Sequence, residues 1–240
     1  MNDYDNYEDW KQWAKETFGT CSSIDAAYFS AELKRAGIET CAGVRFYEIG
    51  FGNGAFAGYV HANKGEYYGS ELNTVLVSRA REFGVAVFDR GIKEALETEN
   101  RGMFDVVVAF DVLEHFDIAG IKDFLLDALI LLKPGGIVLA RVPSGDSPFG
   151  RAIFHGDITH ESALGSSAVR QLASQTDFEV MDIGSPKLPI WGVGFIRSLR
   201  RLGIHCARTI ITWSINLIFH DGQPRVITSN LVFVLRKSFK

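Results

Sequence analysis

The chain has 240 residues, 47% of them hydrophobic and 22% charged, with a formal net charge of −4. This composition is that of an ordinary globular protein with one domain and additions, or at most two small domains. The acidic start is the opposite of a secretory signal, and no apolar run reaches the roughly 18 residues that cross a bilayer. Three cysteines without metal or redox spacing favour reduced thiols, so we expect a soluble, cytoplasmic chain.

Two helices are expected before the core. Aromatic residues alternate with charges at helical spacing from Asp5 to Phe18, which predicts an amphipathic helix. Ser22 or Ser23 is placed to cap a second helix over Ile24–Ala36, which Gly37 ends. These N-terminal helices, residues 1–37, either cover an edge of the core or close over a substrate.

The stretch from Val44 to Val60, VRFYEIGFGNGAFAGYV, organises the rest of the chain. Its apolar start predicts a short buried strand that runs into Gly50, Gly52 and Gly54 and then a helix. Glycine permits positive φ and close approach of a ligand, and the helix start offers free N–H groups. A glycine turn alone also fits an ordinary strand–turn–helix corner. The acidic residues Glu48 and Glu71, each at a strand end, favour a nucleotide-type ligand.

Strand and helix patterns alternate from Tyr67 to Val142. This rhythm predicts a parallel sheet with helices on both faces. The expected strands are Tyr67–Glu71, Val85–Phe88, Asp105–Phe110 and Ile137–Val142. The expected helices are Asn73–Phe83, a short helix to Glu97, and Ile121–Leu132, which the turn Lys133–Gly136 closes.

Four motifs in this order resemble those of the class I S-adenosylmethionine-dependent methyltransferases. The glycine turn has the form E-x-G-x-G-x-G, Asp89 follows the third strand, FDVVVAFDVLEHF spans Phe104–Phe116, and LLKPGG precedes the fifth strand. The resemblance covers residues 44–143. It implies an α/β Rossmann-like fold with a doubly wound, mostly parallel seven-stranded sheet, whose last strand is antiparallel. We expect a single domain over residues 1–240, with residues 144–240 as a substrate-side, C-terminal extension.

The same resemblance implies S-adenosylmethionine as cofactor and S-adenosylhomocysteine as product. The glycines would pass under the methionine part of the cofactor, and Glu48 would order the loop near its amino group. Glu71 would accept both ribose hydroxyls, Leu72 would line the adenine, and Asp89 would meet the adenine edge. The expected cofactor-binding residues are Glu48, Gly50, Gly52, Gly54, Glu71, Leu72, Asp89 and Asp111.

The chain after Ser144 is less regular. Residues 144–160 are rich in turn formers, a helix follows from Ser166 or Ser167 to Thr176, and strands are expected over Phe178–Ile183 and Val226–Leu235. DITHESALGSSAVRQLASQTDFEV, residues 157–180, resembles a segment of methyltransferases of surface-polysaccharide and lipopolysaccharide assembly.

Four side chains are candidate proton acceptors near a methyl acceptor: His115, His155, Asp157 and His160. Histidine titrates near neutral pH, and His115 is the first choice because it follows the fourth strand closely. Packing or a hydrogen bond at a helix start explains His115 equally well. The pattern H-x-D-x-x-H is compatible with a divalent metal. Without a further carboxylate, a hydrogen-bond network is favoured, and we expect no metal.

Basic residues collect near the C-terminus. From Pro186 onward there are nine Lys or Arg and one acid, so this part carries +8 and the remainder −12. Residues 186–219 mix arginines with apolar residues, as interfacial helices do, which predicts weak peripheral membrane contact or an anionic acceptor. Alternatively, the apolar residues are core and the arginines pair with the acidic remainder.

The expected function is methyl transfer to a hydroxyl of a sugar or glycan intermediate, lipid-linked or phosphate-bearing, in polysaccharide biosynthesis. Alternatives are a lipid-soluble aromatic acceptor, such as a quinone precursor, and a non-catalytic scaffold that binds the cofactor. Nucleic acid is not expected as a partner, because the Asn/Asp-Pro-Pro-Tyr/Phe sequence of DNA amine methylation is missing.

Overall fold

The structure is a computed structural model that describes residues 17–97, 101–190, 195–221 and 224–239. Most of the helix predicted over residues 5–18 therefore lies outside the described residues. The strands are β1 (Arg45–Ile49), β2 (Glu66–Ser70), β3 (Ala86–Val87), β4 (Phe104–Phe110), β5 (Leu132–Pro143), β6 (Phe178–Gly184) and β7 (Asn230–Lys237). The helices are α2 (Ser23–Arg35), α3 (Ala55–Ala62), α4 (Thr74–Phe83), α5 (Ile92–Glu97), the 3₁₀ turn η2 (Leu113–His115), α6 (Ile118–Leu131), α7 (Arg151–Phe154), α8 (Ser166–Gln175) and α9 (Phe195–Phe219).

All seven strands form one sheet in the order β3-β2-β1-β4-β5-β7-β6. Strands β1 to β5 run parallel, and β7 inserts antiparallel between β5 and β6. This confirms the predicted seven-stranded, mostly parallel sheet with one antiparallel strand near its end. The chain reverses its direction of travel across the sheet between β1 and β4, the place where open α/β sheets bind ligands.

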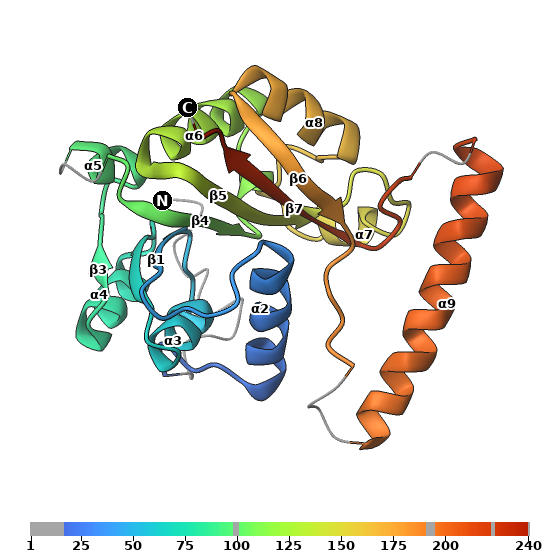
Figure 1. The fold of residues 1–240 in the computed structure, drawn as a ribbon, viewed down its shortest axis with the longest axis horizontal. Coiled ribbons are helices and arrows are strands. Elements are labelled where there is room, and N and C mark those ends of the chain that lie inside the picture. Colours follow the sequence, from blue (N-terminus) through green and yellow to red (C-terminus); the bar gives the residue numbers. More distant parts are fainter. Residues whose placement is uncertain (1–16, 98–100, 191–194, 222–223, 240) are drawn as a thin grey trace.

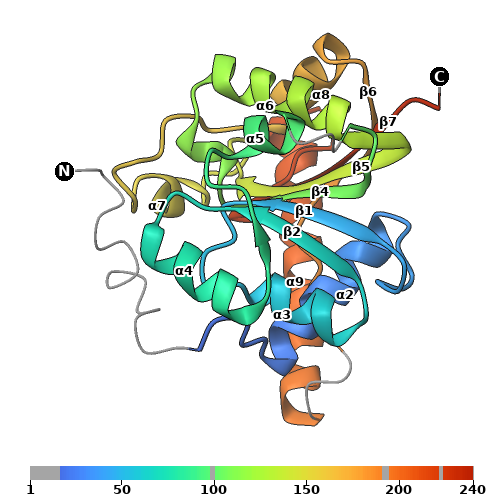
Figure 2. The ribbon, with the colours of Figure 1, turned by 90° about the vertical axis from the view of Figure 1, so that its left-hand side faces the viewer.

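Helices cover both faces of the sheet (Figures 1 and 2). One face carries α5, α6 and α8, and the other carries α2, α3 and α4. Strand β4 is apolar from Val106 to Ala109 because both of its faces are covered there: Val107 and Ala109 enter the core under α6, whereas Val106 and Val108 enter the core against α3. A strand buried on both faces has no position left for a polar side chain.

Local signals at helix ends agree with the sequence. The Ser22 side chain accepts from Asp25 N at 3.1 Å, and Asn73 Oδ1 accepts from Val75 N and Leu76 N at 3.0 and 3.2 Å. Gly84, with φ +96°, ends α4. These caps satisfy N–H groups that a helix start leaves without partners.

Several boundaries differ from the predicted ones. Helix α6 ends where expected, but Lys133–Gly136 belongs to β5 instead of forming a separate turn. The pairing of β4 with β5 shifts register there, and Gly135 takes φ +76°, which absorbs the irregularity. Strand β7 starts at Asn230, so the predicted residues 226–229 precede it.

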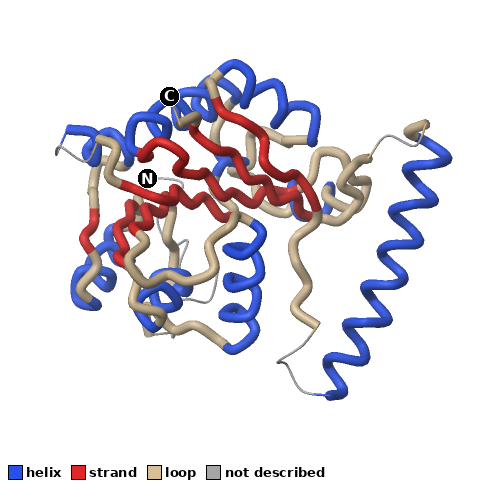
Figure 3. Tube along the Cα trace, viewed as in Figure 1, coloured by secondary structure: helices blue, strands red, loops and turns tan. Residues whose placement is uncertain are grey.

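Helix α9 stands beside the rest of the molecule instead of covering the sheet (Figures 1 and 3). It occupies the last 25 residues of the basic, apolar segment 186–219, and none of its residues is buried. By length and composition alone it is long and apolar enough to cross a membrane. The sequence analysis expected an interfacial helix within residues 186–219 but found no run long enough to cross a bilayer, because arginines interrupt the apolar residues.

Candidate cofactor and acceptor site

A cavity of about 610 Å³ lies where β1 and β4 end, next to α2 and the end of β2. Its volume is in the range of small-molecule and cofactor sites. Aromatic side chains and charged groups share the lining. The lining includes Tyr28, Phe29, Glu48, Gly50, Gly52, Glu71, Leu72, Phe110, Asp111, His115, Phe116 and Arg141.

The glycine turn forms one wall of this cavity. Gly50 and Gly52 line it with φ +65° and +53°, a left-handed conformation that other residues adopt with strain. A Cβ added to Gly50 would lie 2.5 Å from Cγ2 of Val112. The turn therefore needs glycine both for its backbone conformation and for its close packing on Val112, the second residue after β4.

Glu71 connects the end of β2 to the glycine turn. Its Oε2 accepts from Gly52 N at 3.0 Å, and its Oε1 accepts from Leu72 N at 2.7 Å and Asn73 N at 3.1 Å. These bonds hold the carboxylate at the cavity wall, where the sequence predicted a ribose contact. Its hydrogen bond from Gly52 adds a second role, the ordering of the loop, that the sequence did not indicate.

Glu48 is almost fully buried at the floor of the cavity and accepts a hydrogen bond from the Tyr67 hydroxyl. Burial and the nearby Glu71 carboxylate together raise the pKa of Glu48 to about 8, against the lowering effects of the Tyr67 hydrogen bond and the Arg141 charge. Near neutral pH the Glu48 carboxyl is therefore protonated in the free protein. A cationic ligand group bound beside it would favour the ionised form of this carboxyl.

Two predicted cofactor residues lie outside the described lining. Gly54 starts α3 with φ +72°, and its Cα faces the ring of Phe18, so its part is to shape the turn. Asp89 lies on the exposed turn after β3 and pairs with Arg81 at 2.6 Å. Its side chain would have to leave Arg81 to reach an adenine, whereas the following Arg90 lines the cavity. The contact expected for Asp89 stays a prediction.

Asp111 lies at the end of β4 with φ +56° and pairs with Arg141 on β5, whose Nε lies 2.8 Å from its Oδ1. Burial lowers and Asp111 raises the pKa of Arg141, with a net rise that keeps it charged. The guanidinium also lies over the rings of Tyr28 and Phe110, at 5.1 and 5.4 Å. The sequence analysis missed Arg141, although a charge inside an apolar strand was a usable signal.

His115 reaches the cavity from the 3₁₀ turn after β4. Its Nδ1 lies 2.8 Å from Thr159 Oγ1, which in turn donates to Asp157 Oδ1 at 2.6 Å. Burial opposes ionisation of Asp157, but hydrogen bonds from Thr159 and the charges of His160 and His115 lower its pKa overall. Asp157 is therefore an acceptor only, and the single Thr159 proton goes to it.

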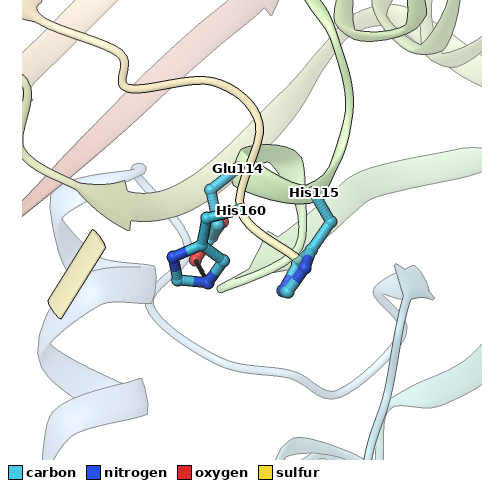
Figure 4. Close-up of side chains that lie close together, drawn as sticks. All are labelled: Glu114, His115 and His160. Carbon is cyan, nitrogen blue, oxygen red and sulfur yellow. Dashed lines mark ion pairs between the residues drawn. The ribbon is translucent and has the colours of Figure 1, made fainter. Parts of the chain in front are cut away.

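Three of the four predicted proton acceptors come together. His160 approaches His115 with ring centroids 4.6 Å apart, and its Nε2 lies 3.9 Å from Glu114 Oε1 and 4.0 Å from Asp157 Oδ2 (Figure 4). His155 does not join them: it is exposed at the end of α7, with its ring against Phe154.

One group here has the residue types of a metal site. Glu114, His115 and His160 each place a potential ligand atom within 4.8 Å of the others. This set differs from the H-x-D-x-x-H pattern considered in the sequence, because Glu114 and His115 take the place of His155 and Asp157. Nδ1 of His115 is hydrogen-bonded to Thr159, and Nδ1 of His160 to Phe154 O at 2.8 Å.

The residues present fit S-adenosylmethionine. The wall formed by Gly50 and Gly52 leaves space where side chains would otherwise project, and Glu71 presents a carboxylate beside it. Buried Glu48 offers a charge partner for the amino group. Leu72, 60% exposed at the cavity mouth, is placed to cover a flat ring.

Comparisons with known proteins agree with this fit. Residues 47–138 match the protein family described as "Methyltransferase domain". No curated protein sequence matches the chain. A SAM dependent methyltransferase from Archaeoglobus fulgidus has a similar structure, with a TM-score of 0.65 and 17% identity over 97% of this chain and 100% of that one.

Two further structures are similar at low identity. The 1,6-didemethyltoxoflavin-N1-methyltransferase of Burkholderia thailandensis, with bound S-adenosylhomocysteine, has a TM-score of 0.58 and 13% identity over 97% of this chain and 84% of that one. The [4+2]-cyclase SpnF has a TM-score of 0.57 and 16% identity over 94% and 86%. The family match and these neighbours support S-adenosylmethionine as the cofactor. Residues 47–138 thus resemble the methyltransferase-domain family, and the whole chain has the fold of the class I S-adenosylmethionine-dependent methyltransferases.

Proposed function

We propose that this protein transfers a methyl group from S-adenosylmethionine to a hydroxyl group of a sugar or glycan intermediate. The observation that carries the proposal is the chain of side chains Asp157–Thr159–His115, which ends at the wall of the cofactor cavity. When bound, the cofactor would supply a sulfonium methyl group for attack by the acceptor oxygen, with S-adenosylhomocysteine as the leaving group. The protein has to position that oxygen and accept its proton.

The hydrogen bonds define the state of His115. Thr159 Oγ1 has one proton, which it donates to the Asp157 carboxylate, so it accepts from Nδ1–H of His115. In the neutral imidazole the lone pair is then on Nε2, the atom that accepts a proton from an acceptor hydroxyl. After transfer, negative Asp157 stabilises the imidazolium through Thr159, as a carboxylate does in other base-orienting networks.

Polar groups around the same cavity suit an acceptor with several hydroxyls. Thr20, Asp25, Asn53 and Arg141 line it together with His115. The segment of residues 157–180, which contains Thr159 and His160, is the one similar to methyltransferases of surface-polysaccharide assembly. These features favour a sugar acceptor and, with it, a cytoplasmic place in polysaccharide biosynthesis.

A second acceptor class is favoured by a different observation. The rings of Tyr28, Phe29, Phe110 and Phe116 also line the cavity, and such a lining suits a flat aromatic acceptor such as a quinone precursor. A third possibility is a scaffold that binds the cofactor without turnover, because proteins that share one fold can have different functions.

Turnover of S-adenosylmethionine labelled on its methyl group separates these functions. The purified full chain would be incubated with glycan fractions, lipid-linked sugar intermediates and quinone precursors in parallel, with His115→Ala as the matched inactive variant. Label in a glycan fraction that depends on His115 supports the proposal. Label only in the aromatic acceptors would contradict the proposal and support methylation of an aromatic acceptor. Tight cofactor binding without label in any fraction would support the non-catalytic scaffold.

A further inference from the structure

Helix α9 exposes an unusual amount of apolar surface. Of the 23 large hydrophobic side chains that are exposed among the described residues, eleven lie on this one helix. Leu199 and Trp213, for example, are 63% and 66% exposed. The apolar stripe, spaced three, four or eight residues apart along one helix face, consists of Phe195, Leu199, Leu202, Ile210, Trp213 and Leu217. Clustered apolar exposure of this kind marks an interaction surface.

The charge of α9 is of one sign. The helix contains four arginines and no aspartate or glutamate. Arg197, Arg200 and Arg208 are exposed, and among the described residues no carboxylate forms an ion pair with them. The alternative expected from the sequence, that these arginines pair with the acidic remainder of the chain, is not seen among the described residues. A basic helix with an apolar stripe complements a lipid bilayer that has anionic headgroups at its surface and apolar acyl chains beneath them.

Polar contacts fix how α9 is held. Arg201 donates to Pro189 O at 2.6 Å, before the helix. Near its other end, Asn216 donates to Arg225 O at 3.3 Å and accepts from Arg225 N at 3.1 Å. These bonds join α9 to the segments on either side of it, whereas the residues of the apolar stripe are exposed. The stripe is therefore presented outward by the fold.

The sheet topology excludes a helix that crosses the bilayer. Strand β6 before α9 and strand β7 after it are paired neighbours. Only residues 185–194 and 220–229 connect the helix to them. If α9 crossed the hydrocarbon, one connection would have to return through about 30 Å of it as irregular backbone, which lipid does not tolerate. The helix is thus confined to the plane of a membrane surface.

We propose that α9 is an interfacial helix that binds this protein to an anionic membrane surface, with the apolar stripe in the headgroup–acyl boundary and the arginines at the lipid phosphates. The partner is the lipid surface itself and not a second copy of the chain. This inference does not rest on methyl transfer, and membrane binding would hold even if the acceptor were another molecule.

Vesicle co-sedimentation with the full chain tests this proposal. We compare vesicles of phosphatidylcholine alone with vesicles of phosphatidylcholine and phosphatidylglycerol mixed in equal parts, each at low and high salt. Binding is expected only to the anionic vesicles and is expected to weaken with salt. The variant Arg197→Gln/Arg208→Gln should lose about 25-fold in partition coefficient, since each charge contributes about fivefold. The control Arg101→Gln/Arg170→Gln removes two exposed charges elsewhere and should bind like the original protein.

A second pair of variants tests the stripe without changing charge. Leu199→Asn/Trp213→Asn should also lose binding to the anionic vesicles, and unchanged thermal unfolding would show that the body of the protein is intact. Equal, negligible sedimentation with both vesicle types overturns the proposal. So does a concentration-dependent dimer in lipid-free solution that Leu199→Asn/Trp213→Asn dissociates, because the stripe would then cover a second copy.

Discussion

Thr159 Oγ1 lies 2.8 Å from Nδ1 of His115, although the two residues are 44 positions apart in the chain. The contact exists because Glu161 N and Ser162 N donate to Glu114 O at 2.7 and 3.1 Å, which docks the loop before α8 onto the turn after β4. A side chain on one loop therefore orients the candidate base on another. The Thr159 hydroxyl, which donates to Asp157, relays the charge of that carboxylate to His115.

Removing that hydroxyl should impair turnover and leave the cofactor site intact. In Thr159→Val, Nδ1 of His115 loses its acceptor, so we expect kcat to fall about 10- to 100-fold, less than the 10²- to 10⁴-fold worth of a general base. Affinity for S-adenosylhomocysteine should not change. Steady-state kinetics across pH, beside calorimetry, measure both. Thr159→Ser keeps the hydroxyl and should restore most of the activity, whereas equal loss in Ser and Val variants would mean that Thr159 acts only by packing.

Glu71 should control cofactor affinity. Glu71→Ala removes the carboxylate expected to accept the ribose hydroxyls and also the acceptor of Gly52 N–H. Hydrogen bonds to a charged group contribute about 1.5–3 kcal/mol each, so affinity should fall at least about tenfold. Isothermal titration with S-adenosylhomocysteine measures it.

Glu66 is the matched control for Glu71, because it lies at the other end of the same strand. It is exposed and pairs with Arg45 at 2.6 Å, far from the glycine turn in the register of β2. Glu66→Ala should keep the original affinity. An unaltered affinity in Glu71→Ala as well would remove Glu71 from the cofactor site.

Most of the fold could be predicted from local sequence patterns. The apolar run of β4, the Asn73 cap and the glycine turn each depend on neighbours within a few residues, so the sequence contains their signal. The sheet order then follows from the alternation of strands and helices. The predicted boundaries were wrong where strand pairing decides them. For example, β5 begins at Leu132 because β4 pairs with it there.

The site was predictable only in part, for a physical reason. Glu48 and Gly52 lie on one continuous motif and Glu71 directly follows the next strand, whereas the partnership of His115 with Thr159 depends on how two distant loops dock. Asp89 shows the reverse case, because its place after β3 was foreseen but Arg81, eight residues earlier, holds its side chain. The exposure of α9 was equally beyond the sequence, since a core helix and an interfacial helix share its composition.

We expect catalysis without a divalent metal. Atoms bound to one ion at about 2.1 Å in a tetrahedral site are about 3.4 Å apart. Glu114 Oε1 and His160 Nε2 are 3.9 Å apart, and the group as a whole spans up to 4.8 Å. Dialysis against a chelator should leave turnover unchanged, and elemental analysis should find less than one equivalent of metal. Activity that the chelator abolishes and magnesium or manganese restores would assign Glu114, His115 and His160 as ligands.

The raised pKa of Glu48 should appear in the pH dependence of stability. Burial raises its pKa from 4.5 to about 8, so between these values the folded chain binds a proton that the unfolded chain has lost. The contribution of Glu48 to the free energy of unfolding therefore falls as pH rises through this window, by at most about 1.4 kcal/mol per pH unit, and is constant above it. Glu48→Gln does not titrate, so denaturant unfolding should show the variant gaining on the original protein from pH 5 to pH 9. Glu66→Gln should show no such trend.

The same group should release a proton when the cofactor binds. Bound beside the positive amino group of S-adenosylhomocysteine, Glu48 is expected to ionise, because an opposite charge favours the charged form of a carboxyl. Near pH 7 the free protein holds that proton, so binding should release close to one proton, and near pH 9, where Glu48 is already ionised, much less from this group. Calorimetry in buffers of different ionisation enthalpy counts the protons. The Glu48→Gln variant corrects for the titration of the ligand itself, and a release that persists unchanged in it would show that Glu48 is not the group that meets the amino group.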